Sequence, residues 1–317
     1  MFPYPNMPYG LPPSYCYPLT EFFMYLLFII TLFNAWKKGI GHVSYLLGGV
    51  GFGLLLEYVN VMSSAGYKYG QFMLMLGHAP DNIPVCIGTS WGIIIYTSRL
   101  ISDNKGLPLW AAAAFDSLLA LSIDLSMDVV AYRLHMWHWS WEDRQLPQMA
   151  LTGDWFGIPY GNFFGWLCVV FFYSLFARTL EIIHFTKAGA IRVWKAIIPL
   201  LSILISQLIL WLTLFPVSTW LKVHFNIVSK EKLIFLLVLF PIMTIAGFTK
   251  KREVTPTVLP FITWLVPVWF HLYFFAWLFI GGFSRENKLM TFLCVTNLFI
   301  VLVIHWWIHI RKPNLGR

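Results

Sequence analysis

Long apolar runs dominate this sequence, and their length is the feature that most constrains its fold. A helix that crosses the hydrocarbon of a bilayer needs about 17 to 25 predominantly apolar residues. Most breaks between the runs carry polar or basic residues, often with glycine or proline. We distinguish nine runs: 19–36, 43–63, 83–101, 109–132, 160–182, 194–215, 231–249, 257–280 and 289–310. The sequence therefore predicts an all-α, polytopic membrane bundle of about eight or nine transmembrane helices.

The composition excludes an ordinary soluble domain. Hydrophobic residues make up 58% of the 317 residues and charged residues only 11%, whereas soluble domains carry about 25% charged residues. The formal net charge of +8 does not indicate a nucleic-acid site, because the basic residues lie in short loops between apolar runs. Residues 1–18 are rich in proline and tyrosine and lack lysine and arginine. We expect an irregular N-terminal arm there and a single transmembrane helical domain over 19–317.

The distribution of basic residues predicts the orientation. With nine spans, the loops on the side of the C-terminus hold 14 lysines and arginines, and the opposite side holds 8. Because cytoplasmic loops are enriched in these residues, we expect a cytoplasmic C-terminus in a bacterial-type cytoplasmic membrane.

The fourth run carries three aspartates, and carboxylates inside a membrane are functional candidates by default. Asp124 and Asp128 are four residues apart, so they lie on one helix face. Two close carboxyl groups do not readily ionise together, which leaves one protonated and able to donate. The alternative is that they pair with Arg99, Arg133 or helix-end donors and only hold the bundle together. The same alternative applies to Asp116, near the start of the run.

Two further runs add polar candidates. Glu57 and Asn60 share a helix face in the second run, and Glu57 lies deep enough to need a partner, either the fourth-run carboxyls or a neighbouring helix. The segment 153–166 reads GDWFGIPYGNFFGW, a stiff turn that places Asn162 in the first turn of the fifth run, with Asp154 just before it. Taken alone, this glycine-aromatic turn is also typical of helix packing.

The longest stretch between runs, 133–159, is rich in tryptophan. Interfacial tryptophan is a common membrane anchor, but several in one loop beside acidic residues also fit a re-entrant lid over a site. Both interpretations stay open for Trp137, Trp139, Trp141 and Trp155. The nine histidines are scattered, and no metal site is predicted from them.

Several short motifs follow one another along the chain: Glu57, Gly66-Tyr67-Lys68-Tyr69-Gly70, Asn82-Ile83-Pro84-Val85, Trp91, Asp124, Asp128, Trp137-His138-Trp139 and the segment from Trp155 to Trp166. In this order they resemble the motifs of the CruF-type carotenoid hydratases, also called the bisanhydrobacterioruberin hydratase or carotenoid biosynthesis protein family. The resemblance covers about residues 45–170, and its clearest part is Trp155 to Trp166. Val129 stands where the family has proline, and the spacing of the tyrosines in the Gly66–Gly70 motif is loose.

The resemblance implies addition of water to a terminal isoprenoid double bond of an acyclic or monocyclic carotene, giving a tertiary alcohol. It implies no cofactor and no metal; the partners are a lipid-soluble substrate and membrane lipid, with no nucleic acid. On this hypothesis Asp124 or Asp128 donates the proton, and Glu57 and Asn162 position water or tune the acid. The expected substrate contacts are Asp116, Asn60, Tyr69, Trp91, Trp137, Trp139, Trp155, Tyr160 and Trp166.

Two other classes of protein fit the same carboxyls. An intramembrane prenyltransferase or terpene cyclase would use them to hold Mg²⁺ and a diphosphate, but it needs a second aspartate-rich motif, which Asp81-Asn82 does not supply. A proton-coupled transporter would use them as proton carriers and predicts internal repeats. We find no clear repeat in the sequence.

Overall fold

Nine long helical segments follow the nine apolar runs in the computed structural model, which describes residues 9–63, 67–139, 153–185, 192–251 and 258–310. Helix η2 (Phe283–Arg285) is a short turn before the last of them. The long segments are α1 (Cys16–Lys38), α2 (Ile40–Ser63), α3 (Val85–Asn104), α4 (Leu109–Arg133), α6 (Tyr160–Phe185), α7 (Arg192–Leu212) continued by η1 (Thr213–Val217) and α8 (Ser218–Phe225), α9 (Ser229–Thr249), α10 (Ile262–Ile280) and α11 (Lys288–Ile310).

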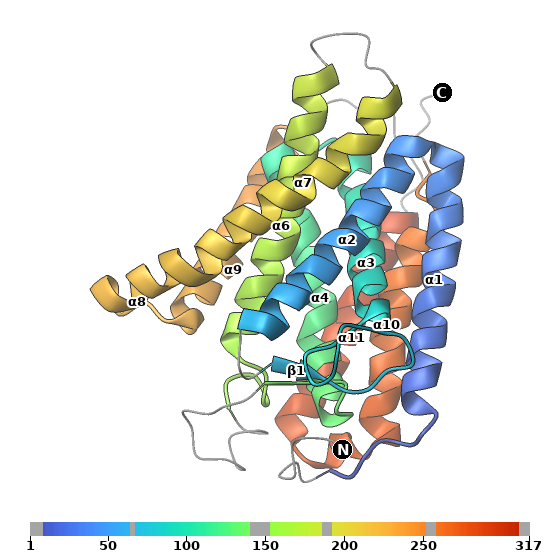
Figure 1. Cartoon of the computed structure of the whole chain (residues 1–317), viewed down its shortest axis with the longest axis vertical. Coiled ribbons are helices and arrows are strands. Elements are labelled where there is room, and N and C mark those ends of the chain that lie inside the picture. Colours follow the sequence, from blue (N-terminus) through green and yellow to red (C-terminus); the bar gives the residue numbers. More distant parts are fainter. Residues whose placement is uncertain (1–8, 64–66, 140–152, 186–191, 252–257, 311–317) are drawn as a thin grey trace.

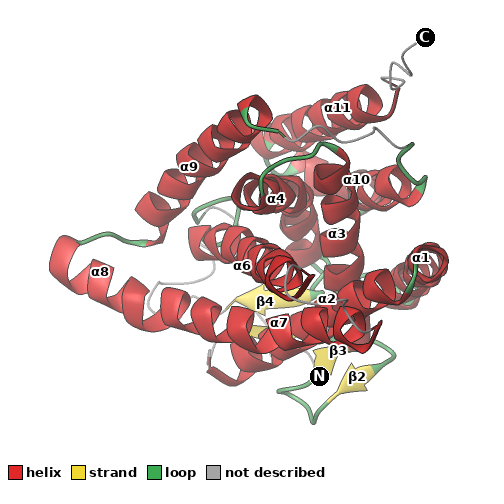
Figure 2. Cartoon of the chain, turned by 90° about the horizontal axis from the view of Figure 1, so that it is seen from above, coloured by secondary structure: helices red, strands yellow, loops and turns green. Residues whose placement is uncertain are grey.

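The helices confirm an integral membrane bundle. Within the described ranges, eight of these segments are long and apolar enough to cross a membrane. Their outward faces carry large apolar side chains such as Phe22, Leu204 and Phe292, each about 60% exposed or more, which in water would be unfavourable. The remaining long helix, α4, carries the three aspartates and lies at the centre of the bundle, in contact with α3, α6, α9, α10 and α11 (Figure 2).

The first helix begins at Cys16 rather than at residue 19. Pro18 lies in its first turn, where a proline is tolerated because that N–H has no partner within the helix. Helix α1 starts at one end of the bundle and α11 finishes at the other (Figure 1).

Two short strand pairs lie at the end of the bundle where α2 finishes and α3 begins (Figure 1). Strand β1 (Tyr67–Tyr69) pairs antiparallel with β4 (Trp137–Trp139), and β2 (Met75–Leu76) pairs with β3 (Ile83–Pro84). In the first pair, Tyr67 lies opposite Trp139 and Tyr69 lies opposite Trp137. Because side chains alternate along a strand, these four rings share one face.

Helices α2 and α3 approach each other closely through glycine. A Cβ atom at Gly49 would lie 3.1 Å from Cα of Gly92, and one at Gly53 would lie 2.5 Å from Cβ of Trp91. Small residues let membrane helices pack backbone to backbone. This contact presses the ring of Trp91 against α2, next to Glu57.

Candidate active site

A cavity of about 210 Å³ lies inside the bundle, under the paired strands β1 and β4. Aromatic rings form much of its wall, and two carboxyl side chains, Glu57 and Asp128, reach into it. The other lining residues are Met24, Leu56, Asn60, Tyr67, Tyr69, Ile87, Ser90, Trp91, Ile94, Met127, Trp137, Trp139, Gly161, Asn162, Gly165, Trp166, Val169, Leu214 and Phe270. Pockets of this kind, mostly apolar with a few converging polar groups, are the usual form of a small-molecule site.

One amide joins the two aspartates on the inner face of α4. Nδ2 of Asn162 donates hydrogen bonds to Oδ2 of Asp124 at 3.0 Å and to Oδ2 of Asp128 at 2.6 Å. The two carboxyl groups are 0% and 2% exposed, and they also lie within reach of each other. Two acidic groups in one dry position cannot both carry a charge cheaply, so the arrangement favours a shared proton.

Glu57 faces this pair from the opposite wall. Its Oε1 accepts a hydrogen bond from the indole Nε1 of Trp91 at 2.9 Å, and Tyr69 and Asn60 are its other polar neighbours. Among the described residues, Oε2 of Glu57 has no hydrogen-bond partner, although the side chain is buried. A buried unpaired carboxylate oxygen is costly, and the cavity beside it offers space for a polar ligand atom.

The turn before α6 sets the position of Asn162. Asp154 and Phe156 have positive φ angles of 41° and 51°, and Oδ2 of Asp154 accepts the backbone N–H of Tyr160 at 3.0 Å. This bond satisfies a free donor of the first helical turn. Arg133 holds the turn from the end of α4 by donating to the carbonyl oxygen of Phe156 at 3.0 Å. The turn thus fixes the start of α6, and with it the direction of Asn162.

The strand pair closes the cavity on one side. Burial, followed by the nearby charge of Glu57, raises the pKa of Tyr67, and burial likewise raises the pKa of Tyr69. Both phenols therefore stay protonated at neutral pH, and the Tyr67 hydroxyl donates to the Tyr69 hydroxyl at 3.1 Å. Burial lowers the pKa of His138 to about 4. The roof of the cavity, which β1 and β4 form, therefore carries no imidazolium charge at pH 7.

The structure brings together most of the residues that the sequence indicates. The cavity wall includes Glu57, Asn60, Tyr69, Trp91, Asp128, Trp137, Trp139, Asn162 and Trp166. Asp124 joins them through Asn162. Their indole and phenol rings come from four elements, and the rings of Trp91 and Trp166 lie 4.1 Å apart between centroids.

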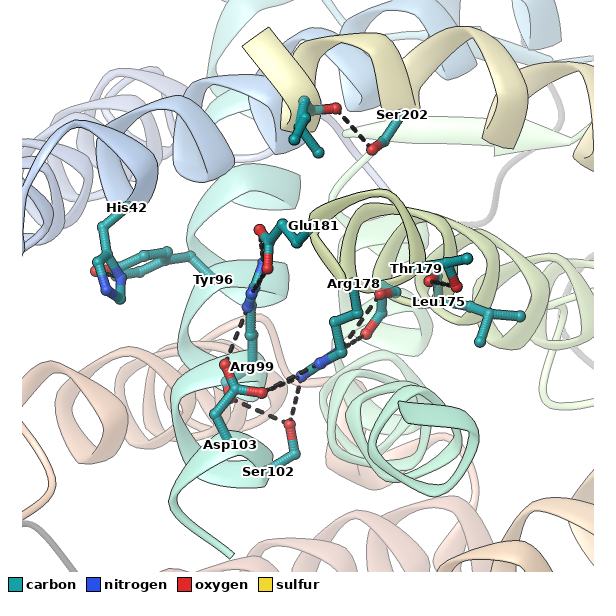
Figure 3. Close-up of polar contacts among 12 residues, drawn as sticks. His42, Tyr96, Arg99, Ser102, Asp103, Leu175, Arg178, Thr179, Glu181 and Ser202 are labelled. Atoms are coloured by element: carbon teal, nitrogen blue, oxygen red, sulfur yellow. Dashed lines mark hydrogen bonds and ion pairs between the residues drawn. The ribbon is translucent and has the colours of Figure 1, made fainter. Parts of the chain in front are cut away.

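Asp116, expected as a substrate contact, lies in a different cluster. Its Oδ2 accepts hydrogen bonds from Ser174 at 2.6 Å and from Arg178 at 2.8 Å. Arg178 also bonds to Ser102 and Asp103 at the far end of α3 (Figure 3). The physical reason is the helix rise of about 1.5 Å per residue, which separates positions 116 and 128 by roughly 18 Å. Asp116 thus belongs to an ion-pair network between α3, α4 and α6.

Two other expected substrate contacts serve the turn instead. The indole Nε1 of Trp155 donates to the carbonyl oxygen of Leu125 at 3.0 Å, and Tyr160 contacts Asp154 through its N–H and its hydroxyl. Neither side chain is among those that line the cavity. The lid interpretation of the tryptophan-rich loop extends to Trp141, which lies outside the described residues.

Arg99 and Arg133, the alternative partners of Asp124 and Asp128, pair elsewhere. Arg99 contacts Asp103 and Glu181 (Figure 3), and Arg133 makes a two-bond pair with Glu286, with both distances 2.7 Å. The aspartate pair near Asn162 thus has no guanidinium partner in the described part of the chain.

From the sequence alone, several residues of the wall are not assigned to the site, among them Ser90, Phe270 and Tyr67, the last of which is named only as part of a motif. Tyr67 had a usable signal, because Tyr67-Lys68-Tyr69 places two rings on one face if the segment is extended. Phe270 had none, since a phenylalanine in an apolar run is typical of any membrane helix.

Comparison with known proteins identifies the family. The family model described as "Carotenoid biosynthesis protein" matches residues 19–230, which is more than half of the chain and includes every residue of the cavity wall except Phe270. The chain belongs to the carotenoid biosynthesis protein family. No curated protein and no solved structure matches the sequence.

Membership of the carotenoid biosynthesis family agrees with the character of the cavity. Carotenoids are long apolar polyenes dissolved in the bilayer, and the cavity combines aromatic walls with carboxyl groups and half-buried residues on α2 and α6. Such a site can bind an apolar chain end, give it a proton and surround a cation with π faces.

Proposed function

We propose that this protein is a carotenoid hydratase, a hydro-lyase that adds water to a terminal isoprenoid C=C of an acyclic or monocyclic carotene. The product is a tertiary alcohol. This proposal is finer than the family assignment, and it is supported by the carboxyl groups, the amide and the aromatic rings that meet in one cavity.

The first step is protonation of the alkene. The protonated member of the Asp124–Asp128 pair gives its proton to the less substituted carbon of the double bond, and the π electrons form the new C–H bond. A tertiary carbocation remains at the other carbon. A neutral carboxylic acid in a dry site is suited to this step, and the Asn162 amide stabilises the carboxylate left behind by donating to both groups.

The second step is capture of the cation by water. Oε2 of Glu57, which has no partner in the described residues, accepts a hydrogen bond from a water molecule and orients its lone pair toward the cation. As the C–O bond forms, the water releases one proton to a carboxylate, and the cluster regains the proton it gave. One water is consumed, and no electrons are exchanged with another reactant.

The aromatic wall stabilises the cation between the two steps. The rings of Trp91, Trp137, Trp166 and Tyr69 face the same space, and indole faces attract positive charge at about 0.5 to 2 kcal/mol each. The roof keeps bulk water away, so that a single oriented water reacts.

The observation that carries the proposal is the single amide of Asn162 bridging Asp124 and Asp128 beside a cavity that also holds Glu57. We would test it by expression in a lycopene-producing bacterium, with pigments separated by liquid chromatography and their masses measured by mass spectrometry. The expected result is a pigment heavier than lycopene by the mass of one or two water molecules. Asp128→Asn should lower the yield by about 100-fold or more, because it removes an acid–base group.

A matched change controls for general damage. Asp81 pairs with Lys68 away from the cavity, so Asp81→Asn should leave hydration unchanged. Unaltered lycopene in cells that contain well-folded protein would contradict the hydratase. Conversion of a prenyl diphosphate that stops when Mg²⁺ is chelated would favour a prenyltransferase or cyclase instead.

A further inference from the structure

Among the described residues, the wall of the cavity is most exposed along one edge. The lining residues from α3, α4 and α10 are buried, whereas most of those on α2 and α6 are half-buried. Five of the half-buried members border the gap between α2 and α6, namely Leu56 and Asn60 on α2, Gly161 and Gly165 on α6, and Leu214 on η1; the others are Asn162, Trp166 and Trp139. The opening therefore lies between α2 and α6, beside η1.

The path of α7 explains this opening. Along the first half of α2, α7 packs so closely that a Cβ atom at Gly48 would lie 3.0 Å from the carbonyl oxygen of Pro199. It then continues through η1 into α8, which extends away from the bundle (Figure 1). The second half of α2 is left uncovered, and Tyr58 and Met62 there are 49% and 58% exposed.

Gly165 keeps the opening clear. A Cβ atom at this position would meet no atom within 4 Å, and one at Gly161 would meet only Ser229, at 3.4 Å. These glycines are thus not required for helix packing, as Gly48 is. They face the same cavity in which Oε2 of Glu57, on a side chain 6% exposed, has no partner among the described residues.

The size of the cavity limits what can enter. A cavity of about 150 Å³ holds one benzene molecule, and a water occupies about 30 Å³. The space of about 210 Å³ therefore suits one open-chain end with a water or two, and the rest of a long polyene must remain outside.

We propose that the opening between α2 and α6, kept clear by Gly161 and Gly165, is the portal through which one open-chain end of a polyene enters from the bilayer. Gly165 is then a residue that determines access and specificity. The remainder of the chain stays among the lipids, so the protein recognises the end of its substrate and not its length. This inference rests on the proposed function for the reacting substrate, but the portal can be tested separately.

The first test fills the portal. Gly165→Leu should reduce lycopene hydration by about 100-fold, because a misplaced reacting group costs about that much, while the amount of folded protein in the membrane stays the same. Gly165→Ala should have a smaller effect. Gly10→Leu is the matched control, since a Cβ atom at Gly10 also meets nothing within 4 Å but lies outside the cavity. Hydration by Gly165→Leu at the wild-type rate would overturn the portal.

The second test does not depend on activity. The four native cysteines are buried, so Gly165→Cys can be labelled selectively with a membrane-soluble maleimide. Lycopene in the same vesicles should slow maleimide labelling of the Gly165→Cys variant. It should not slow labelling of Leu204→Cys, because Leu204 is 67% exposed on the outer face of α7.

The two tests separate the portal from the proposed reaction. Protection by lycopene without any hydration by the wild type would support the portal and contradict the hydratase. Hydration by the wild type without protection, and with an active Gly165→Leu, would support the hydratase and contradict the portal.

Discussion

Asn162 bonds two carboxyl groups with one nitrogen atom, at 3.0 and 2.6 Å. Replacing it with leucine keeps a similar volume but removes the donor. We expect Asn162→Leu to lower the hydration rate by about 100- to 1000-fold, the usual effect of losing one preorganised donor. The measurement is the initial rate of water addition to lycopene by purified protein in vesicles.

A second asparagine provides the control for this change. Asn297 on α11 donates to the carbonyl oxygen of Ser122 at 2.8 Å, on a different face of α4. Asn297→Leu should retain the wild-type rate in the folded fraction. Equal losses in both variants would mean that Asn162 has only a structural role.

The residues of the site that the sequence could predict are those fixed by local geometry. The four-residue spacing of Asp124 and Asp128 places both on one helix face, and the segment 153–166 places Asn162 in the first turn of α6. Asp116 shows the limit of this reasoning. Its position along α4 follows from its residue number and the helix rise per residue. Its partner, Arg178, lies 62 residues away in the sequence and is specified only by tertiary packing.

At the scale of elements, Arg178 ties three helices together opposite the cavity. It extends from α6 to Asp116 on α4. Its contacts with Ser102 and Asp103 on α3 are drawn in Figure 3. Arg178→Met leaves Asp116 buried without its cation, so we expect a loss of about 3 to 5 kcal/mol in the free energy of unfolding. Thermal unfolding in detergent would measure it, and protein that remains folded should still hydrate lycopene.

Arg285 offers a comparison for this substitution. It lies exposed in η2, where Arg285→Met should change the free energy of unfolding by less than about 0.5 kcal/mol. If Arg178→Met is equally mild, the network around Asp116 does not stabilise the helix contact.

The strands illustrate what helix periodicity cannot predict. The nine helical segments follow from run length and hydropathy alone, because each satisfies its own backbone hydrogen bonds. The pairing of β1 with β4 joins Tyr67 to Trp139 across a large part of the sequence, and no local pattern specifies that partner. Once paired, alternation along both strands turns separate aromatic residues into one roof.

At the scale of the whole molecule, the nine helical segments predict that the two termini lie on opposite sides of the membrane. The end of the bundle away from the cavity carries basic residues at the ends of α1 and α9, namely Lys37, Lys38 and Lys250. Because cytoplasmic loops are rich in lysine and arginine, we expect this end and the C-terminus to face the cytoplasm. A reporter that works only in the cytoplasm should be active when fused after residue 317.

A reporter that works only after export is the counterpart. It should be active when fused before residue 1 and inactive when fused after residue 317. The reverse pattern would mean that the protein has the opposite orientation, with the cavity in the cytoplasmic half of the membrane.

The two reactants come from different phases. Water surrounds the end of the bundle that β1 and β4 close, whereas the polyene is confined to the lipid beside the opening between α2 and α6. The enzyme would thus work at a phase boundary, with one reactant at fixed activity and the other diluted in two dimensions. Turnover should then follow the mole fraction of polyene in the bilayer, and adding inert lipid to the same suspension would slow it.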